Sequence, residues 1–286
     1  MHADHAPHSP HRLRGPVALC IALAVVAVVA YAHGAAFWYA PLAVVGVVLA
    51  HVLVFGAITW VMLRHARGGG HAHDESMLLH RPRQYDRLAR FILLGREAAL
   101  RSWMLDLGGV GEGSAVLDVG AGTGTLLVAA AGRVGASGAV KGLEPSAEMR
   151  AHARQKALAA GVSIELVDGS AAELPFPDQA FDAVFCTLVL HHLPDAMHER
   201  ALVEMCRVLR PGGRVVIVEW QQPTSLLSAL LSPLFMVSVL HGFGARGSLF
   251  DRLGIEARLR DLGLASVTRE AFGPGGSVGA VVGQKA

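Results

Sequence analysis

The sequence predicts an α/β fold, a seven-stranded doubly wound sheet, preceded by a transmembrane helical hairpin. Two long apolar runs free of Asp, Glu, Lys and Arg lie between residues 16 and 63, although 17% of the whole chain is charged. From residue 115 onward, short β-branched runs alternate with helical stretches, which is the order of a parallel sheet covered by helices. Several of these runs end in glycine or an acidic residue, at the strand ends where open α/β sheets bind ligands.

The two apolar runs cover residues 16–32 and 35–63. Each is long enough to cross a bilayer, which takes about 20 residues in a helix. The turn at 33–34 is too short to hold a domain, and the aromatic residues at 37–39 fall where an interfacial belt is expected. The pattern therefore predicts two membrane-spanning helices joined by a tight turn.

Arginines flank the hairpin at both outer ends, with Arg12 and Arg14 before it and Arg64 and Arg67 after it. The positive-inside rule places both ends in the cytoplasm, so we expect a multi-pass protein of the cell membrane whose large domain is cytoplasmic. The sequence at 30–32 also resembles a signal-peptidase site, so cleavage of the first run stays an alternative.

These features divide the chain into four parts: a disordered His-rich tail (1–15), the two spans (16–63), a linker (64–80) and a large folded domain (81–286). The His-rich stretches have no fixed ligand spacing, and we expect no metal site. The net charge of +2 has mixed signs, which excludes a nucleic-acid footprint. The three cysteines form no CxxC pair and are expected to be buried thiols in a reducing compartment.

A glycine-rich turn is the strongest chemical signal. The apolar run that starts at Ala115 ends in Gly120, Gly122 and Gly124, and a helical stretch over 125–132 follows. Glycines allow a ligand close to the backbone, and the helix N-terminus offers unpaired N–H groups. The turn is thus suited to a nucleotide-type ligand.

The spacing of this turn is D-x-G-x-G-x-G, with Asp118 at the strand end. A dinucleotide fingerprint (GxGxxG) would place its third glycine where Thr125 stands. The motif instead resembles that of the class I S-adenosylmethionine-dependent methyltransferases, in the group that contains the ubiquinone and menaquinone methyltransferases. The resemblance implies a Rossmann-like methyltransferase sheet, with Asp118 and the three glycines binding S-adenosyl-L-methionine.

Two further strand ends match this family. The strand over 139–144 ends in Glu144, which the resemblance assigns to both ribose hydroxyls. The strand at 164–168 ends in Asp168, followed by Gly169 and Ser170. By resemblance, the aspartate contacts the adenine amino group and the residues after it wall the ring.

The match extends from Tyr85 to Val218. Tyr85 stands where the family's lid often touches the methionine part, although plain packing would also explain it. A fourth strand over 181–190 precedes His191 and His192, and a Pro-Gly-Gly turn precedes the fifth. We expect Asp182, Glu204, Arg207 and this turn to be structural, as ion pairs, caps or solvated faces.

Methyl transfer from a sulfonium mainly needs alignment, with a base only where the acceptor loses a proton. His191 and His192 follow the fourth strand, and a histidine accepts protons near neutral pH, so both are candidate catalytic residues. They also fit a role in shaping the pocket.

The acceptor is predicted from location. The run over 225–243 is apolar, is broken by Pro233 and occupies the usual position of the acceptor lid. Together with the hairpin, it favours a small lipid-soluble acceptor, such as a quinone precursor, a phospholipid headgroup or an isoprenoid-like molecule. A helix over 252–262 and strands over 266–272 and 277–282 complete the sheet. The rival interpretations are an NAD(P)-type oxidoreductase and a catalytically silent membrane-anchored binding protein.

Overall fold

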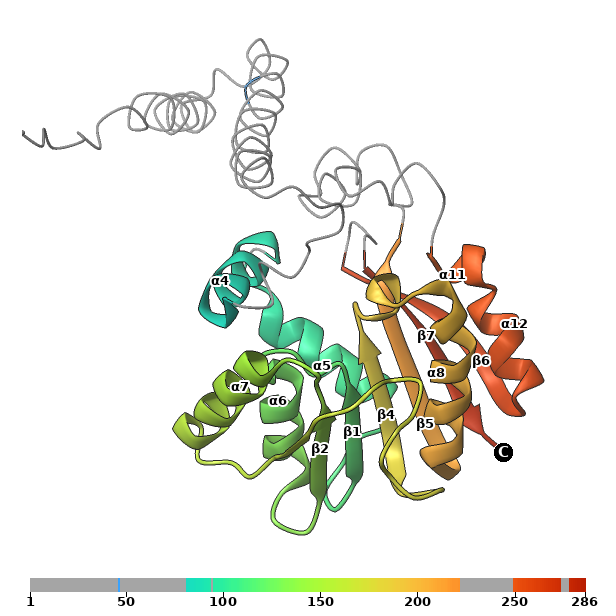
Figure 1. Ribbon diagram of the computed structural model, residues 1–286, viewed down its shortest axis with the longest axis horizontal. Helices are drawn as coiled ribbons and strands as arrows, with labels where there is room; N and C mark the ends of the chain where they lie inside the picture. Colours follow the sequence, from blue (N-terminus) through green and yellow to red (C-terminus); the bar gives the residue numbers. More distant parts are fainter. Residues whose placement is uncertain (1–45, 47–80, 94, 222–248, 274–277) are drawn as a thin grey trace, which may run out of the picture. The chain divides into compact units, whose positions relative to one another are not determined.

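The computed structural model describes residues 46, 81–93, 95–221, 249–273 and 278–286 (Figure 1). The chain divides into two units, Met1–His71 and Ala72–Ala286, and all described residues but one belong to the second. Apart from residue 46, the expected spans (16–63), the linker (64–80) and the apolar run over 225–243 lie outside the described residues. Within the described ranges, no helix has the length and apolarity needed to cross a bilayer.

The second unit is built on one seven-stranded sheet of order β3-β2-β1-β4-β5-β7-β6. β1 to β5 are parallel, and β7 runs antiparallel to both β5 and β6. The predicted seven-stranded doubly wound sheet is therefore confirmed. The strands are β1 (Ala115–Val119), β2 (Ala139–Leu143), β3 (Glu165–Val167), β4 (Phe181–Thr187), β5 (Leu209–Trp220), β6 (Leu264–Phe272) and β7 (Val278–Lys285).

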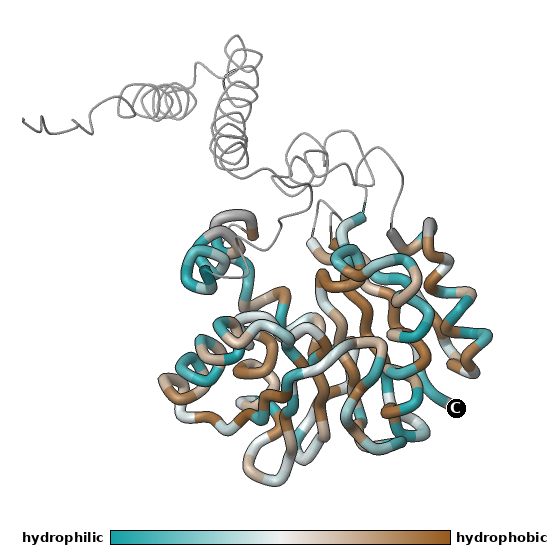
Figure 2. The backbone as a smooth tube through the Cα atoms, viewed as in Figure 1, coloured by the Kyte–Doolittle hydropathy of each residue, from teal (hydrophilic) through white to brown (hydrophobic). Residues whose placement is uncertain are grey.

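Helices cover both faces of this sheet (Figure 1). One face packs against α5 (Glu97–Leu107), α6 (Thr125–Val134) and α7 (Ala147–Ala159). The opposite face packs against α8 (Asp195–Val208), α11 (Leu249–Leu253) and α12 (Ile255–Asp261). Helix α4 (Pro82–Ile92) precedes these layers, and a 3₁₀ turn, η1 (Leu190–His192), follows β4. Hydrophobic residues concentrate in the strands, and hydrophilic residues lie on the outer helix surfaces (Figure 2).

The central strands are buried on both faces, which explains why they are continuous apolar runs. In β1, Val116 and Leu117 point to opposite faces and neither is exposed. Asp118 is the exception in this strand, a buried acid at the carboxyl end. A charged group in that place needs a reason other than packing.

Several boundaries differ from the sequence prediction, three of them at turns. The helix expected over 252–262 is two helices, because Gly254 between them has φ of +58°. β4 ends at Thr187 instead of residue 190, because Leu188 adopts φ of +55°. β5 begins at Leu209, ahead of the Pro-Gly-Gly sequence.

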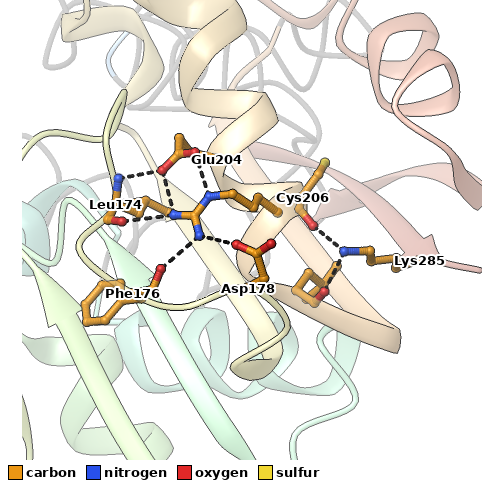
Figure 3. Close-up of polar contacts among 8 residues, drawn as sticks. Leu174, Phe176, Asp178, Glu204, Cys206 and Lys285 are labelled. Atoms are coloured by element: carbon orange, nitrogen blue, oxygen red, sulfur yellow. Dashed lines mark hydrogen bonds and ion pairs between the residues drawn. The ribbon is translucent and has the colours of Figure 1, made fainter.

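That sequence lies in a bulge of β5. The pairing with β4 changes from Phe181↔Leu209 to Ala183↔Arg214, so residues 210–213 have no partner in register. The C-terminal strand is tied to the same region, because Lys285 Nζ donates hydrogen bonds to the carbonyls of Cys206 and Leu209, both at 2.8 Å (Figure 3).

Candidate cofactor site and active site

The glycine-rich turn follows β1 and has three positive-φ residues with different surroundings. Gly120 has φ of +74°, and a Cβ there would lie 2.4 Å from Val189 Cγ2. A Cβ at Gly124 would lie 2.7 Å from Ala153 Cβ. Gly122 has φ of +53° and nothing within 4 Å of a Cβ position. The outer glycines are therefore needed for packing, and the middle one borders open space.

Glu144 follows β2 and is held against this turn. Its Oε2 accepts the N–H of Gly122 at 2.8 Å, and its Oε1 accepts the N–H of Ser146 at 2.9 Å. The residue is 6% exposed. Each oxygen keeps a further acceptor position, so the carboxylate is oriented without being saturated.

Two oppositely charged residues, Asp118 and Arg101, each have a buried polar atom without a partner among the described residues. These atoms are Asp118 Oδ1 and Arg101 Nε. Burial raises the pKa of Asp118 to about 7; the charge of Arg101 lowers it and that of Glu144 raises it. A buried acceptor and a buried donor thus remain unsatisfied beside the glycine turn, and Arg101 had no signal in the sequence.

Tyr85, on α4, lies close to the same charges. Burial raises the pKa of its hydroxyl, Arg101 lowers it, and the carboxylates of Asp86, Glu144 and Asp118 raise it. Tyr85 is therefore near enough to Glu144 and Asp118 for their charges to act on its hydroxyl.

Asp86, the next residue of α4, joins this helix to the turn. Its Oδ1 accepts the hydroxyl of Thr123 at 2.6 Å, and its Oδ2 lies 2.8 Å from Lys156 Nζ and 3.0 Å from His152 Nε2. Lys156 also donates to Thr125 Oγ1 at 2.8 Å. Burial raises the pKa of Asp86, but hydrogen bonds from Lys156, Thr123 and His152 outweigh it, so the pKa is below its usual value. These contacts hold α4 over the turn.

Replacement of Asp86 by alanine is expected to loosen α4. Loss of the charge-assisted hydrogen bonds should lower the free energy of unfolding by about 1–3 kcal/mol. Trypsin should cleave faster in α4, which has exposed arginines at 83, 87 and 90. Asp106→Ala, which removes an exposed partner of Arg133, is the matched control. Equal cleavage of the two variants would contradict this role of Asp86.

The expected adenine-binding residues follow β3. Asp168 has a side chain 68% exposed and pairs with Arg150 at 3.2 Å. Arg150 also donates to the Glu144 carbonyl at 2.5 Å, so it links the ends of β2 and β3. Gly169 is packed tightly, since a Cβ there would lie 2.8 Å from Leu143 Cδ1. Ser170 Oγ accepts a backbone N–H at 3.2 Å and closes the turn.

Arg207 of α8 holds the loop after Ser170. Figure 3 shows Leu174, Phe176 and Asp178 of this loop beside Glu204. The Arg207 guanidinium donates to the carbonyls of Leu174 and Phe176 at 3.0 and 2.9 Å, and to Asp178 at 2.6 Å. Glu204 accepts from Arg207 at 2.7 Å and from the Leu174 N–H at 2.7 Å. The hydrogen bond from Arg207 holds the pKa of Glu204 below its usual value. The ion pair expected for Arg207 is present. Glu204 was expected on a solvated helix face, but it is the partner of Arg207 in this pair.

The two histidines lie in η1 and differ in environment. His191 has a side chain 8% exposed, and its Nδ1 is 2.8 Å from Glu219 Oε2. His192 is exposed, and its ring lies against His191 with centroids 3.9 Å apart. The buried carboxylate of Glu219 thus pairs with His191, and no pattern in the sequence indicated Glu219 as its partner.

Unpaired buried polar atoms gather at the carboxyl edge of the sheet. Among the described residues they include Asp118 Oδ1 at the end of β1, Thr187 Oγ1 at the end of β4 and Glu219 Oε1 near the end of β5. The sheet order reverses between β1 and β4, the point where such sheets bind ligands. Buried polar atoms without partners are rare and fit a site that a polar ligand completes.

Comparison with known families agrees with this geometry. Residues 116–213 match the family model described as "Methyltransferase domain". The chain is 38% identical over 162 residues to a demethylmenaquinone methyltransferase of Bacillus cytotoxicus, covering 56% of this chain and 68% of the relative. It is 40% identical over 144 residues to the Bacillus cereus protein of the same name, covering 50% of this chain and 60% of that relative.

Solved structures agree on the fold. An S-adenosylmethionine-dependent methyltransferase from Aquifex aeolicus superposes with a TM-score of 0.52 at 22% identity, covering 72% of this chain and 98% of that one. A putative S-adenosylmethionine-dependent methyltransferase from Methanococcus maripaludis superposes with a TM-score of 0.59 at 17% identity, covering 76% of this chain and 98% of that one. The chain has the glycine turn, the oriented acid after β2 and the relatives described above. It therefore belongs to the class I S-adenosylmethionine-dependent methyltransferases, enzymes whose cofactor is S-adenosyl-L-methionine.

Proposed function

We propose that this methyltransferase transfers a methyl group to a small lipid-soluble acceptor of the quinone class, such as demethylmenaquinone. Support comes from the two Bacillus relatives that carry the name demethylmenaquinone methyltransferase. The aligned segment spans 68% and 60% of their lengths, so the acceptor of the whole protein is part of the proposal.

The arrangement of the described residues supports a binding mode for the cofactor. The unpaired buried atoms Asp118 Oδ1 and Arg101 Nε are the observation that carries it, because the amino-acid part of S-adenosylmethionine has one ammonium and one carboxylate. Asp118 would hold the ammonium and Arg101 the carboxylate. The cofactor supplies an electrophilic methyl group on a sulfonium.

The remaining contacts follow from the same placement. The two oxygens of Glu144 would each accept one ribose hydroxyl, and the open space before Gly122 would admit the ligand. The turn from Asp168 to Ser170 would border the adenine, with Gly169 packed behind it. Tyr85 would cover the site from α4.

A pH dependence follows from the pKa of Asp118, which is about 7 in the protein without ligand. Binding of an ammonium requires the ionised carboxylate, so a proton must be released on binding below that pH. Affinity for S-adenosylhomocysteine should therefore fall by up to about tenfold per pH unit as pH drops from 7 to 5.5. Isothermal titration calorimetry measures this slope.

The matched variant for this titration is Asp118→Asn. It should bind more weakly at pH 8, and its affinity should lose most of the pH dependence below 7, because the amide does not titrate. A wild-type affinity that is constant between pH 8 and 5.5 would contradict the assignment of Asp118 to the ammonium.

We further propose that the protein works at the cytoplasmic face of the cell membrane, anchored by two spans over 16–63. The apolar runs and their flanking arginines support this, and so does α4, whose Arg83, Arg87 and Arg90 are exposed. These three arginines recur at intervals of four and three residues and thus share one helix face. Exposed arginines near a bilayer attract anionic headgroups by about 1 kcal/mol each.

The test of location uses the full chain. After expression, the protein should sediment with membranes and resist carbonate extraction, and trypsin should cleave the catalytic domain only in inverted vesicles. Carbonate-soluble protein would contradict the anchor, and cleavage in right-side-out vesicles would contradict the orientation.

The test of activity follows the transfer of labelled methyl groups into organic-soluble product. The full chain in detergent is incubated with methyl-labelled S-adenosylmethionine and demethylmenaquinone, and the variant Glu144→Ala is run in parallel. The proposal predicts that the wild type forms labelled product. The variant should form less of it, because it binds the cofactor more weakly. Binding of S-adenosylhomocysteine without labelled quinone would contradict the acceptor but not the cofactor.

A further inference from the structure

A buried acid outside the cofactor-binding set is Glu219, near the end of β5. It is 1% exposed, and its Oε2 lies 2.8 Å from Nδ1 of His191. Its other oxygen, Oε1, is buried without a hydrogen-bond partner among the described residues. Burying a carboxylate is costly unless it is paired, so the Nδ1–H of His191 is the contact that accounts for its position.

The other buried histidine provides a contrast. His198 of α8 is 3% exposed, and its Nε2 donates to the carbonyl of Leu190 at 2.7 Å. This bond attaches His198 to the start of η1, while its Nδ1 has no hydrogen-bond partner among the described residues and lies 3.7 Å from the exposed Asp195. His191, by comparison, has a carboxylate on Nδ1 and lies one residue after Leu190, in a turn that His198 supports.

The segment that carries His191 is strained and close to the cofactor turn. Leu188 has φ of +55°, which is unfavourable for a residue with a branched side chain. Its N–H still bonds to the carbonyl of Val218 at 2.8 Å, so the strained residue stays attached to β5. The next residue, Val189, occupies the space that a side chain at Gly120 would need. Such strain is characteristic of functional segments.

We propose that Glu219 is a positioning residue that holds His191 as the Nδ1–H tautomer, and that His191 Nε2 accepts a proton from the methyl acceptor. The inference rests on the proposed function and narrows it to acceptors that lose a proton, such as a hydroxyl or a quinol ring. The acceptor gives its proton to Nε2 and keeps the electron pair of that bond. It bonds the methyl carbon, and the pair of the broken carbon–sulfur bond stays on sulfur.

The carboxylate contributes in two ways. As an acceptor it selects which ring nitrogen carries the proton, and as a negative charge it stabilises the imidazolium formed during transfer. Glu219 makes its contact with the His191 ring, and the ring of His192 lies against His191 and is exposed. The pair therefore distinguishes between two histidines that the sequence left equivalent.

Nitrogen-15 NMR of the imidazole rings tests the pair without an acceptor. The full chain is labelled on histidine, and the His191 signals are assigned by their loss in His191→Gln. In the neutral ring we expect a protonated Nδ1 and an unprotonated Nε2, and in Glu219→Gln a shift toward the opposite tautomer. An unprotonated Nδ1 in the wild type would overturn the proposal, and apart from the assignment this result is read from the wild-type protein alone.

Glu256→Gln is the matched control. It removes a different paired carboxylate, that of Glu256 on α12, whose partner is Arg269. It should leave the His191 tautomer unchanged. If Glu219→Gln does not fold, Glu219→Asp keeps the charge and should retain the wild-type tautomer. A tautomer shift of the same size in Glu256→Gln would overturn the specific role of Glu219.

Turnover provides the second readout, with demethylmenaquinone as the probe. Glu219→Gln should slow methyl transfer at least tenfold while the affinity for S-adenosylhomocysteine changes less than twofold. The double variant with His191→Gln should be no slower than His191→Gln alone, since both act through one proton transfer. If the two substitutions slowed methyl transfer independently, so that their effects multiplied in the double variant, the proposed action of Glu219 through His191 would be overturned. Failure of the wild type on this quinone would contradict only the acceptor, because the tautomer measurement decides the pair.

Discussion

Replacing Gly120 by alanine is expected to lower the free energy of unfolding by about 2–5 kcal/mol and to abolish measurable cofactor binding. The backbone there has φ of +74°, and the new Cβ would lie 2.4 Å from Val189 Cγ2. Left-handed φ costs an alanine roughly 1–2 kcal/mol, and overpacking adds about 1–3 kcal/mol. Urea unfolding and titration with S-adenosylhomocysteine measure the two effects.

Gly122→Ala is the matched control within the same turn. Its φ is +53°, but no atom lies within 4 Å of the new Cβ. The variant should lose only about 1–2 kcal/mol of stability, from the backbone term alone. Its binding should still fall, because the added methyl group occupies the open side of the turn. Equal loss of stability in both variants would show that the contact with Val189 has no energetic importance.

Replacing Arg207 by alanine should have the second largest effect on stability, about 2–3 kcal/mol. The guanidinium binds Glu204, Asp178 and two carbonyls of the loop after β3, and it is 29% exposed. Its removal leaves the Glu204 carboxylate, 18% exposed, without its main partner, which is more costly than breaking a solvated pair. Thermal unfolding with and without S-adenosylhomocysteine measures the loss.

The control lies three residues along the chain. Arg210 pairs with Asp182, and both side chains are more than 40% exposed. Arg210→Ala should change stability by only about 0–1 kcal/mol. We also expect weaker cofactor binding in Arg207→Ala but not in Arg210→Ala, because only Arg207 holds the loop next to Ser170. Similar results for the two variants would contradict a role of Arg207 in shaping the site.

Local patterns accounted for the order of elements and for the glycine turn. Strand ends at Asp118 and Glu144 are readable because apolar runs, glycines and acids follow one another within a few residues. The same patterns placed Pro-Gly-Gly before β5, whereas it lies in a bulge of that strand. A bulge depends on pairing with β4, which is distant in sequence.

The amino-acid sequence alone was sufficient for the seven strands, the family and the acids at the strand ends, because these depend on short-range order along the chain. Tertiary structure decided the partners of those acids. The charge of Arg101 on α5 acts on Asp118, Asp86 joins α4 to Thr123, and Glu219 contacts His191. These pairs join residues that are 17, 37 and 28 positions apart, and such proximity arises only when the sheet and its helices pack.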